Sequence, residues 1–375
     1  MGGRNHHSEP FDEATLVKLD LYRRYVRAWL PVFLNSPNLK VDKIQIFDFF
    51  AGPGHDVNGK SGSPLIALEE IKDAMNIDHR NNPEIHLYLN EMMKHKFETL
   101  KGACAESELA RIVKFHYLNK EFGDAFREWS PVIGQDTYAC KTASLVFFDQ
   151  NGTKQITRDV FAKIISSVRT DFLFFIASSY IYRFRTQPHN VEPAPILPRD
   201  FEGMTMKNAH RKVCDAYRRL IPQDLRYYLA PFSIAKDFGS NVYGLIFGSG
   251  HPLGMDKFLK ICWTEDTLTG EANYDIDDDN IDPAQPTFWP ERPKKIESFE
   301  RQLAARVLDR TLRDNVDVYN YALNHGFRAA HAKEALNNMV TARELPKQSF
   351  AISYNSCGSS NSVRHPIVLS EGSKR

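Results

Sequence analysis

The stretch FFAGPGHDVNGKSGSPLIA, residues 49–67, decides the fold because it joins a β-rich run to a helix. "KIQIFDFF" (43–50) leads into it, and "SPLIALEEIKDAM" (63–75) has helical spacing, with Pro64 suited to the first turn after a Ser cap. Two incompatible sites fit the turn between them. The small residues of 51–54 would let the backbone approach a bulky ligand, whereas residues 54–61 match the phosphate-binding pattern G-x-x-x-x-G-K-[ST].

Outward from this turn, β-rich and helical runs alternate. Further strands are predicted at "EIHLYLNE" (84–91), "RIVKFHYLN" (111–119), "ASLVFFD" (143–149), "TDFLFFIAS" (170–178) and "VYGLIFGSG" (242–250). Helices are predicted at 13–34, 92–104, 157–168, 205–221 and 254–263. Such alternation predicts an α/β fold with a doubly wound, mostly parallel, Rossmann-like sheet whose ligands lie at the carboxyl ends of the strands.

The chain is expected to divide into several parts. We expect an N-terminal helical segment at 1–40, the sheet domain at 41–272, an acidic Pro-rich linker at 273–295, a small α+β domain at 296–356 and a flexible tail at 357–375. The 296–356 region has three helical segments, a glycine turn at Gly326 and a β-like segment at 349–355, a pattern similar to a winged helix.

Composition limits the possible functions. Lys and Arg number 48 and Asp and Glu 47, so the formal net charge of +1 provides no overall basic field for nucleic acid. The five cysteines are scattered without a C-x-x-C pair, which favours a reducing cytoplasm and argues against a disulfide framework or structural zinc. Because the histidines show no ligand spacing either, no metal site is expected. No apolar run approaches the roughly 20 residues that span a bilayer, so no membrane is expected.

The phosphate interpretation would make the chain a P-loop NTPase that uses residues 54–61, with Asp149 as a magnesium ligand. In a true phosphate loop, the helix begins at the Gly-Lys-Ser itself. Here Pro64 would stand where a helical N–H should bond to the carbonyl of Lys60, and its ring would clash there. We therefore expect the helix to begin at residues 63–64 and Lys60 to lie in a loop.

A methyl-donor interpretation uses the earlier glycines. It predicts a cofactor site made of residues at the ends of the first three strands: Asp48, Ala51, Gly52, Gly54, Glu91 and Asn119. In this site Asp48 orients water or the donor's amino group, and Glu91 binds the ribose hydroxyls. The fourth strand ends in a polar loop that would face the transferable methyl group, and its expected catalytic residues are Asp149, Gln150 and Asn151.

The combination of FDFFAGPG, GSPLIAL, LYLNE and VFFDQNGTKQIT with a winged-helix-like unit resembles the three-Cys-motif partner protein family, TcmP. The resemblance covers residues 15–350. It implies an S-adenosylmethionine (SAM) methyltransferase-like fold, SAM as cofactor and a radical-SAM-like three-cysteine protein as partner. Gln150 stands where a D-P-F-G-like sequence would have Pro, which departs from the pattern of amino-methyltransferases.

The acceptor is not fixed by these motifs. A C5-pyrimidine mechanism is disfavoured because no Pro-Cys dipeptide exists. Basic side chains that could contact nucleic acid or a partner are Arg183, Arg185, Arg211, Arg218, Arg328 and Lys333. A solvated helix face explains the same charges. A non-catalytic scaffold and a winged-helix nucleic-acid-binding regulator therefore remain alternatives to the methyltransferase and the NTPase.

Overall fold

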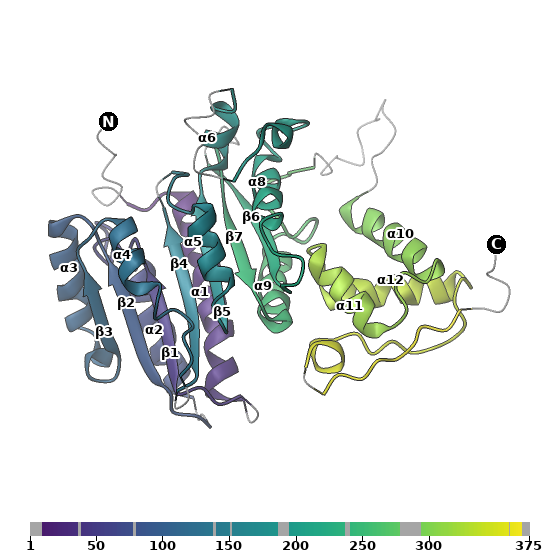
Figure 1. Cartoon of the computed structure of the whole chain (residues 1–375), viewed down its shortest axis with the longest axis horizontal. Coiled ribbons are helices and arrows are strands. Elements are labelled where there is room, and N and C mark those ends of the chain that lie inside the picture. Colours follow the sequence, from purple (N-terminus) through teal and green to yellow (C-terminus); the bar gives the residue numbers. More distant parts are fainter. Residues whose placement is uncertain are drawn as a thin grey trace. The chain divides into compact units, whose positions relative to one another are not determined.

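A computed structural model describes residues 10–36, 39–77, 80–137, 140–150, 152–186, 195–236, 241–277, 294–359 and 361–369. The chain separates into two compact units, Met1–Gly250 and His251–Arg375 (Figure 1). Among the described helices, none has both the length and the apolar character that crossing a bilayer requires.

The first unit is built on a seven-stranded sheet in the order β3-β2-β1-β4-β5-β7-β6 (Figure 1). The strands are β1 Lys43–Asp48, β2 Glu84–Asn90, β3 Lys114–Leu118, β4 Thr142–Asp149, β5 Thr170–Ile176, β6 Tyr228–Lys236 and β7 Asn241–Ser249. Strand β7 runs antiparallel to both of its neighbours, and the other pairs are parallel. The predicted doubly wound, mostly parallel Rossmann-like sheet is confirmed. Its strand order reverses between β1 and β4, where such sheets bind ligands.

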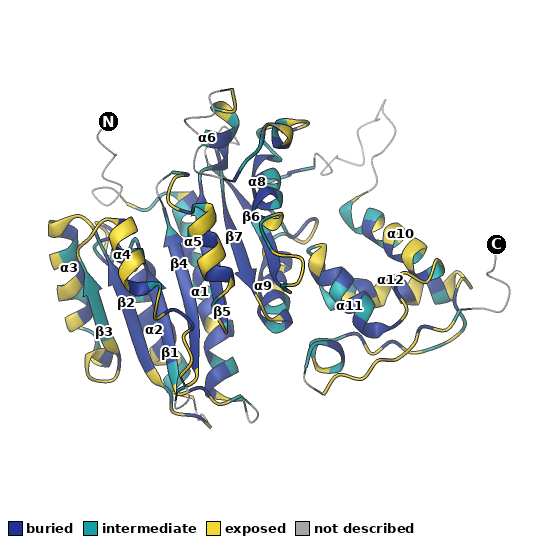
Figure 2. Ribbon diagram, in the orientation of Figure 1, coloured by how far each residue is buried: buried dark blue, intermediate teal, exposed yellow. Residues whose placement is uncertain are grey.

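Helices cover both faces of this sheet (Figure 2). They are α1 Glu13–Leu34, α2 Ser63–Met75, α3 Lys94–Ala105, α4 Phe122–Trp129, α5 Arg158–Ile165, α6 Ser178–Arg183 and α8 Ala209–Arg218, with short 3-10 turns at Glu108–Arg111 and Pro198–Phe201. Helix α1 lies on one face, because the Tyr22 ring stands 4.4 Å from Phe147 and the Tyr25 ring 4.7 Å from Phe247. Helices α4, α5 and α8 close the other face in one buried aromatic cluster.

The alternation of side chains along a strand determines which face of the sheet the polar residues at the strand ends point to. Phe47 and Phe148 belong to the cluster under α4, α5 and α8. Because successive side chains of a strand point to opposite faces, Asp48 and Asp149 are directed toward α1. Two acids from neighbouring strands therefore meet on one face at the carboxyl edge.

The second unit consists of helices α9 Pro252–Glu265, α10 Lys295–Leu308, α11 Asn315–Asn324 and α12 Ala329–Thr341, with a π-helical turn at Tyr354–Gly358. Gly326 takes a positive φ of 77° between α11 and α12, as expected for a glycine turn. The Trp263 indole N–H donates to the Gly326 carbonyl at 2.9 Å, so α9 is fastened to this turn. Helix α9, expected within 41–272, thus packs inside the second compact unit.

Two expectations for the second unit differ from the structure. The predicted β segment at 349–355 is wrong, since residues 349–353 form no strand and a π-helical turn begins at Tyr354. Residues 361–369 were expected in a flexible tail, yet Ile367 N donates to Arg313 O at 2.8 Å and the Ile367 side chain is buried. Most of the expected linker, residues 278–293, lies outside the described residues.

Candidate active site

Asp48 ends β1 and organises the turn that follows. Its Oδ1 accepts the Phe50 N–H at 3.0 Å, and its Oδ2 accepts the Ser63 hydroxyl at 2.6 Å. The side chain is only 1 % exposed, and this burial raises the pKa of Asp48 to about 7. The Ser63 hydroxyl therefore bonds to Asp48 and does not cap α2 as expected. Gly62 occupies the N-cap position of this helix.

The turn after Asp48 requires glycine at two positions. Gly52 has φ of 63° and Gly54 φ of 96°, conformations that side-chain-bearing residues rarely adopt. Ala51 N donates to Asn90 O at 3.0 Å, which fastens the turn to the end of β2. The backbone at 51–54 therefore forms a tight bend at the carboxyl edge, next to the reversal of strand order.

Residues 54–62 form a closed loop, and the negatively charged group that its backbone N–H groups bind belongs to the protein itself. The buried Asp56 carboxylate accepts the N–H groups of Phe11 at 3.0 Å, Asn58 at 2.9 Å and Lys60 at 2.8 Å. The chain returns to itself through Gly62 N to Gly54 O at 2.7 Å before α2 begins. Backbone donors that would cradle a phosphate are thus already bonded to a carboxylate, and Lys60 is exposed as expected for a loop residue.

Glu91, directly after β2, lies against the glycine turn. Its Oε2 accepts the Gly52 N–H at 3.0 Å, and its Oε1 accepts the Met93 N–H at 2.7 Å. Asn119, after β3, donates from Nδ2 to the carbonyls of Glu91 at 2.6 Å and Met92 at 2.9 Å. The structure therefore brings Gly52, Glu91 and Asn119, three predicted cofactor residues, into one hydrogen-bonded group.

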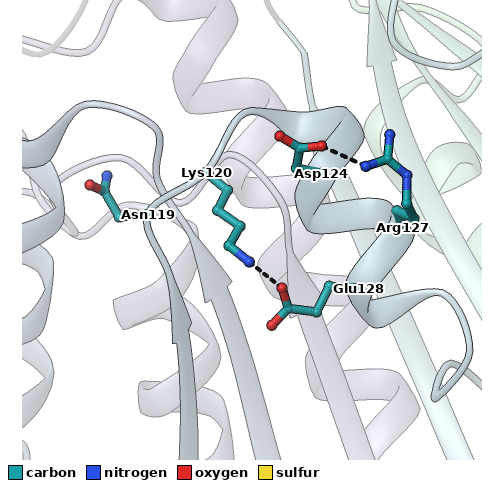
Figure 3. Close-up of a pocket in the computed structure, with 5 residues that line it drawn as sticks. All are labelled: Asn119, Lys120, Asp124, Arg127 and Glu128. Carbon is teal, nitrogen blue, oxygen red and sulfur yellow. Dashed lines mark hydrogen bonds and ion pairs between the residues drawn. The ribbon is translucent and has the colours of Figure 1, made fainter.

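A surface hollow of about 460 Å³ borders this group (Figure 3). Its lining consists of Asn119, Lys120, Asp124, Arg127 and Glu128. Lys120 pairs with Glu128, and Arg127 donates to Asp124 at 2.8 Å, so the hollow is polar and internally paired. The glycine turn and Asp149 do not line it, and only Asn119 connects it with the predicted site.

The end of β4 holds an ion pair that sequence reasoning missed. Lys18 Nζ of α1 donates to Asp149 Oδ2 at 2.5 Å, with side chains 7 % and 23 % exposed, respectively. The ammonium also stands 4.7 Å from the centre of the Phe175 ring. Lys18 lies one turn before Tyr22 on the buried stripe of α1, and this i,i+4 position is the one sequence signal that pointed to it.

The remaining residues of the β4 loop have different roles. Gln150 is buried, its Oε1 accepts the Gln155 N–H at 2.9 Å, and its carbonyl accepts the Gly152 N–H at 3.1 Å. Among the described residues, Gln150 Nε2 has no hydrogen-bond partner. Asn151, the third predicted catalytic residue, lies outside the described residues.

The predicted basic contacts are carried by several elements of the two units. Arg218 pairs with Asp215 and donates to the Leu229 carbonyl at 3.0 Å, so it ties α8 to β6. Arg211 is also carried by α8, one side of which is buried. Arg185 follows α6 and stacks over the Tyr182 ring at 4.3 Å, and Arg183 is the last residue of that helix.

Arg328 and Lys333 belong to the second unit. Arg328 is the N-cap of α12, and its backbone N–H bonds to His331 Nδ1 at 3.3 Å. Burial, reinforced by Arg328 and Lys295, lowers the pKa of His331 to about 4, so this imidazole is neutral at physiological pH. Lys333 is exposed on the same helix.

No family model matches the chain, and no curated protein matches it. Several solved structures are similar to about two thirds of it. An O-methyltransferase from Bacillus cereus in complex with SAH is 9% identical with a TM-score of 0.33, covering 64% of this chain and 91% of the other. The O-methyltransferase TomG from Streptomyces achromogenes in complex with SAM is 12% identical with a TM-score of 0.32, covering 63% and 89%. Such scores are too low to support a function, and the fold assignment above depends on the strand order.

Proposed function

We propose that the first unit is a SAM-dependent methyltransferase that binds its donor at the carboxyl edge of β1, β2 and β4. The observation that supports this proposal most strongly is the bond between Glu91 Oε2 and Gly52 N at 3.0 Å. It joins a glycine bend to a strand-end acid at the reversal of strand order, where nucleotide-like ligands bind in doubly wound sheets.

The chain's residues fit an adenosyl donor. Gly52 and Gly54 leave the bend free of side chains, so its backbone can approach the ligand closely. The Glu91 carboxylate keeps lone pairs for two ribose hydroxyls, since each oxygen accepts one backbone N–H and has room for another donor. Asn119 fixes the Glu91 loop. SAM supplies an electrophilic methyl group, and the protein's task is to align an acceptor with it.

The proposal extends to the protein partner and to the acceptor of the methyl group. We infer that the chain works with a radical-SAM-like three-cysteine protein in the manner of the TcmP family, on nucleic acid or on a substrate held by that partner. The aromatic and arginine side chains around α6 support nucleic acid, and Arg328 and Lys333 are candidate contacts of the second unit. The five cysteines are free thiols, which suits a cytoplasmic location.

Two alternative functions make different predictions. Use of residues 54–61 by a P-loop NTPase is disfavoured by Asp56, which already bonds the backbone donors of that loop. A non-catalytic scaffold would bind its partner equally well after Asp149→Ala, and it would not transfer methyl groups.

Calorimetry of the full chain with S-adenosylhomocysteine and, separately, with Mg·ATP tests the proposal. We expect the homocysteine compound to bind and Mg·ATP not to bind. Binding of Mg·ATP alone would overturn the assignment.

A further inference from the structure

We propose that Lys18 is a positioning residue that holds Asp149 as the proton acceptor for a hydroxyl nucleophile, and that this nucleophile is the ribose 2′-hydroxyl of RNA. The inference rests on the proposed methyltransferase function and specifies its acceptor. Nothing in the sequence patterns assigned a role to Lys18.

The Lys18–Asp149 pair is arranged asymmetrically. The Lys18 side chain is nearly buried, with 7 % exposure, whereas Asp149 keeps 23 % of its side chain accessible. Lys18 engages Oδ2 alone. A buried ammonium on one carboxylate oxygen fixes the rotamer of Asp149. Within the described part of the chain, the other oxygen, Oδ1, accepts no hydrogen bond.

The hydrogen-bond acceptors of the β4 loop favour a nucleophile with one proton. An amino nucleophile has two N–H groups, and orienting its lone pair toward the methyl group requires two acceptors. Gln150 is fully buried, so neither its Oε1, bonded to Gln155 N at 2.9 Å, nor its carbonyl, bonded to Gly152 N at 3.1 Å, is accessible to a substrate. Among the described acceptors at the end of β4, Asp149 Oδ1 is then the one left to a substrate, and it matches the one O–H of an alcohol.

The segment beside the β4 loop fits a nucleic acid. Ala177 N, just before α6, donates to Gly152 O at 3.3 Å, so α6 begins at the β4 loop. This segment carries half-buried Tyr180, Tyr182 and Phe184, and the exposed Arg185 stacks on Tyr182. Aromatic faces bind nucleobases, and guanidinium groups bind phosphates. Among nucleic acids, RNA carries a hydroxyl on each internal ribose, which distinguishes it from DNA.

The transfer balances as a single displacement. A lone pair of the 2′-oxygen forms the new O–C bond while the C–S bond breaks, and its electron pair stays on sulfur, leaving neutral S-adenosylhomocysteine. The hydroxyl proton passes to Asp149 Oδ1 and then to water. Lys18 keeps its own proton throughout and acts only through Asp149.

Labelling of matched nucleic acid pools tests the acceptor. The full chain is incubated with methyl-tritiated SAM and a random-sequence RNA pool, or with the corresponding DNA pool. A 2′-O-methyl group removes the hydroxyl that attacks the adjacent phosphate in alkali, so the label is expected in alkali-resistant dinucleotides of RNA and not in DNA. Label released as mononucleotides, equal label in DNA, or no labelled RNA would overturn the proposal.

Donor binding is measured on the same preparation, because it separates this proposal from the proposed function. If S-adenosylhomocysteine binds while RNA receives no label, the acceptor assignment fails and the methyltransferase proposal stands. If S-adenosylhomocysteine does not bind, both fail.

Variants of two cations on α1 test the role of Lys18. We expect Lys18→Met to lower kcat by about 100-fold, the range of general-base catalysis, with KM for the donor unchanged. Lys18→Arg should restore most of the rate. The matched control is Arg27→Met, which removes another α1 cation from a buried carboxylate, Glu70, that keeps Arg23 at 3.1 Å. An equal rate loss in Arg27→Met would show that Lys18 merely docks the helix and would overturn its positioning role.

Discussion

The two edges of the sheet hold acids in contrasting surroundings. At the amino edge, Asp171 of β5 is 8 % exposed and accepts the Tyr25 hydroxyl at 2.7 Å, with Ser249 as a further donor. At the carboxyl edge, Asp48 is buried as well, but it lies beside a glycine bend and near the Lys18–Asp149 pair. Burial raises the pKa of both, to about 6 for Asp171 and about 7 for Asp48.

A raised pKa therefore does not identify the functional edge by itself. The same contrast appears along β2, where exposed Glu84 at the amino end pairs with Lys114 and His86, which lower the pKa of Glu84 to about 2. Glu91, at the other end, bonds backbone N–H groups of two loops. The acids described at the amino edge bond to neighbouring side chains, whereas Asp48 and Glu91 at the carboxyl edge also accept backbone N–H groups of the loops that follow β1 and β2.

Replacing Asp171 should have the largest effect on stability. Asp171→Ala removes the acceptor shared by Tyr25 and Ser249, so we expect the free energy of unfolding to fall by about 2–3 kcal/mol. Urea unfolding measures this loss, and calorimetry should show unchanged affinity for S-adenosylhomocysteine. A large loss of donor affinity in a folded variant would contradict the proposed difference between the acids at the amino and carboxyl edges.

Asp48 should make stability depend on pH. Between about pH 4 and pH 7 the folded chain retains a proton on Asp48 that the unfolded chain has lost. As the pH rises through this window, Asp48 therefore makes the free energy of unfolding fall by up to about 1.4 kcal/mol per pH unit. Below that window both states are protonated and the dependence disappears. Asp48→Asn should flatten the decline in urea unfolding across the window. An unchanged slope would mean that Asp48 is not the buried acid described here.

Much of this architecture follows from local patterns, and the exceptions have physical causes. The buried runs at β4 and β5 consist almost wholly of apolar residues, so both strands and the acid that ends β4, Asp149, were predictable. Strand β6 was missed because Pro231 interrupts it. The structure tolerates this proline because β6 is the edge strand of the sheet. The short helices α4 and α6 were missed as well.

The site was predictable only in part. The glycine bend and the strand-end acids lie at one edge as expected, since parallel strands end together. Lys18 escaped notice because its partner, Asp149, is 131 residues away, and no local spacing reveals such a contact. The direction of Gln150 was equally hidden, because its bond to Gln155 depends on how the loop closes.

Two glutamates, one at the start of β2 and one directly after its end, sharpen the contrast through donor binding. Glu91→Gln weakens the acceptor at the glycine bend, and we expect about tenfold lower affinity for S-adenosylhomocysteine, as for one charge-assisted hydrogen bond. Glu84→Gln, at the opposite end of the same strand, is the matched control and should leave affinity unchanged. Calorimetry of both variants gives the ratio, and equal affinities would contradict the assigned role of Glu91.

The smallest expected effect is that of Lys60→Ala. Only the Lys60 backbone is engaged by Asp56, and the side chain is exposed, so affinity for S-adenosylhomocysteine and stability should match the parent protein. Thermal unfolding with and without the compound measures both. A loss of donor binding would extend the functional edge into the 54–62 loop.

The central claim is that the bend at residues 51–54 and Glu91 hold an adenosyl donor. A crystal structure of the chain with S-adenosylhomocysteine tests it most directly. We predict that the ribose hydroxyls bond to the Glu91 carboxylate and that the sulfur faces Asp149. The account would be contradicted by the compound lying away from this edge, or by a Mg·ATP complex in which the Lys60 ammonium binds the phosphates.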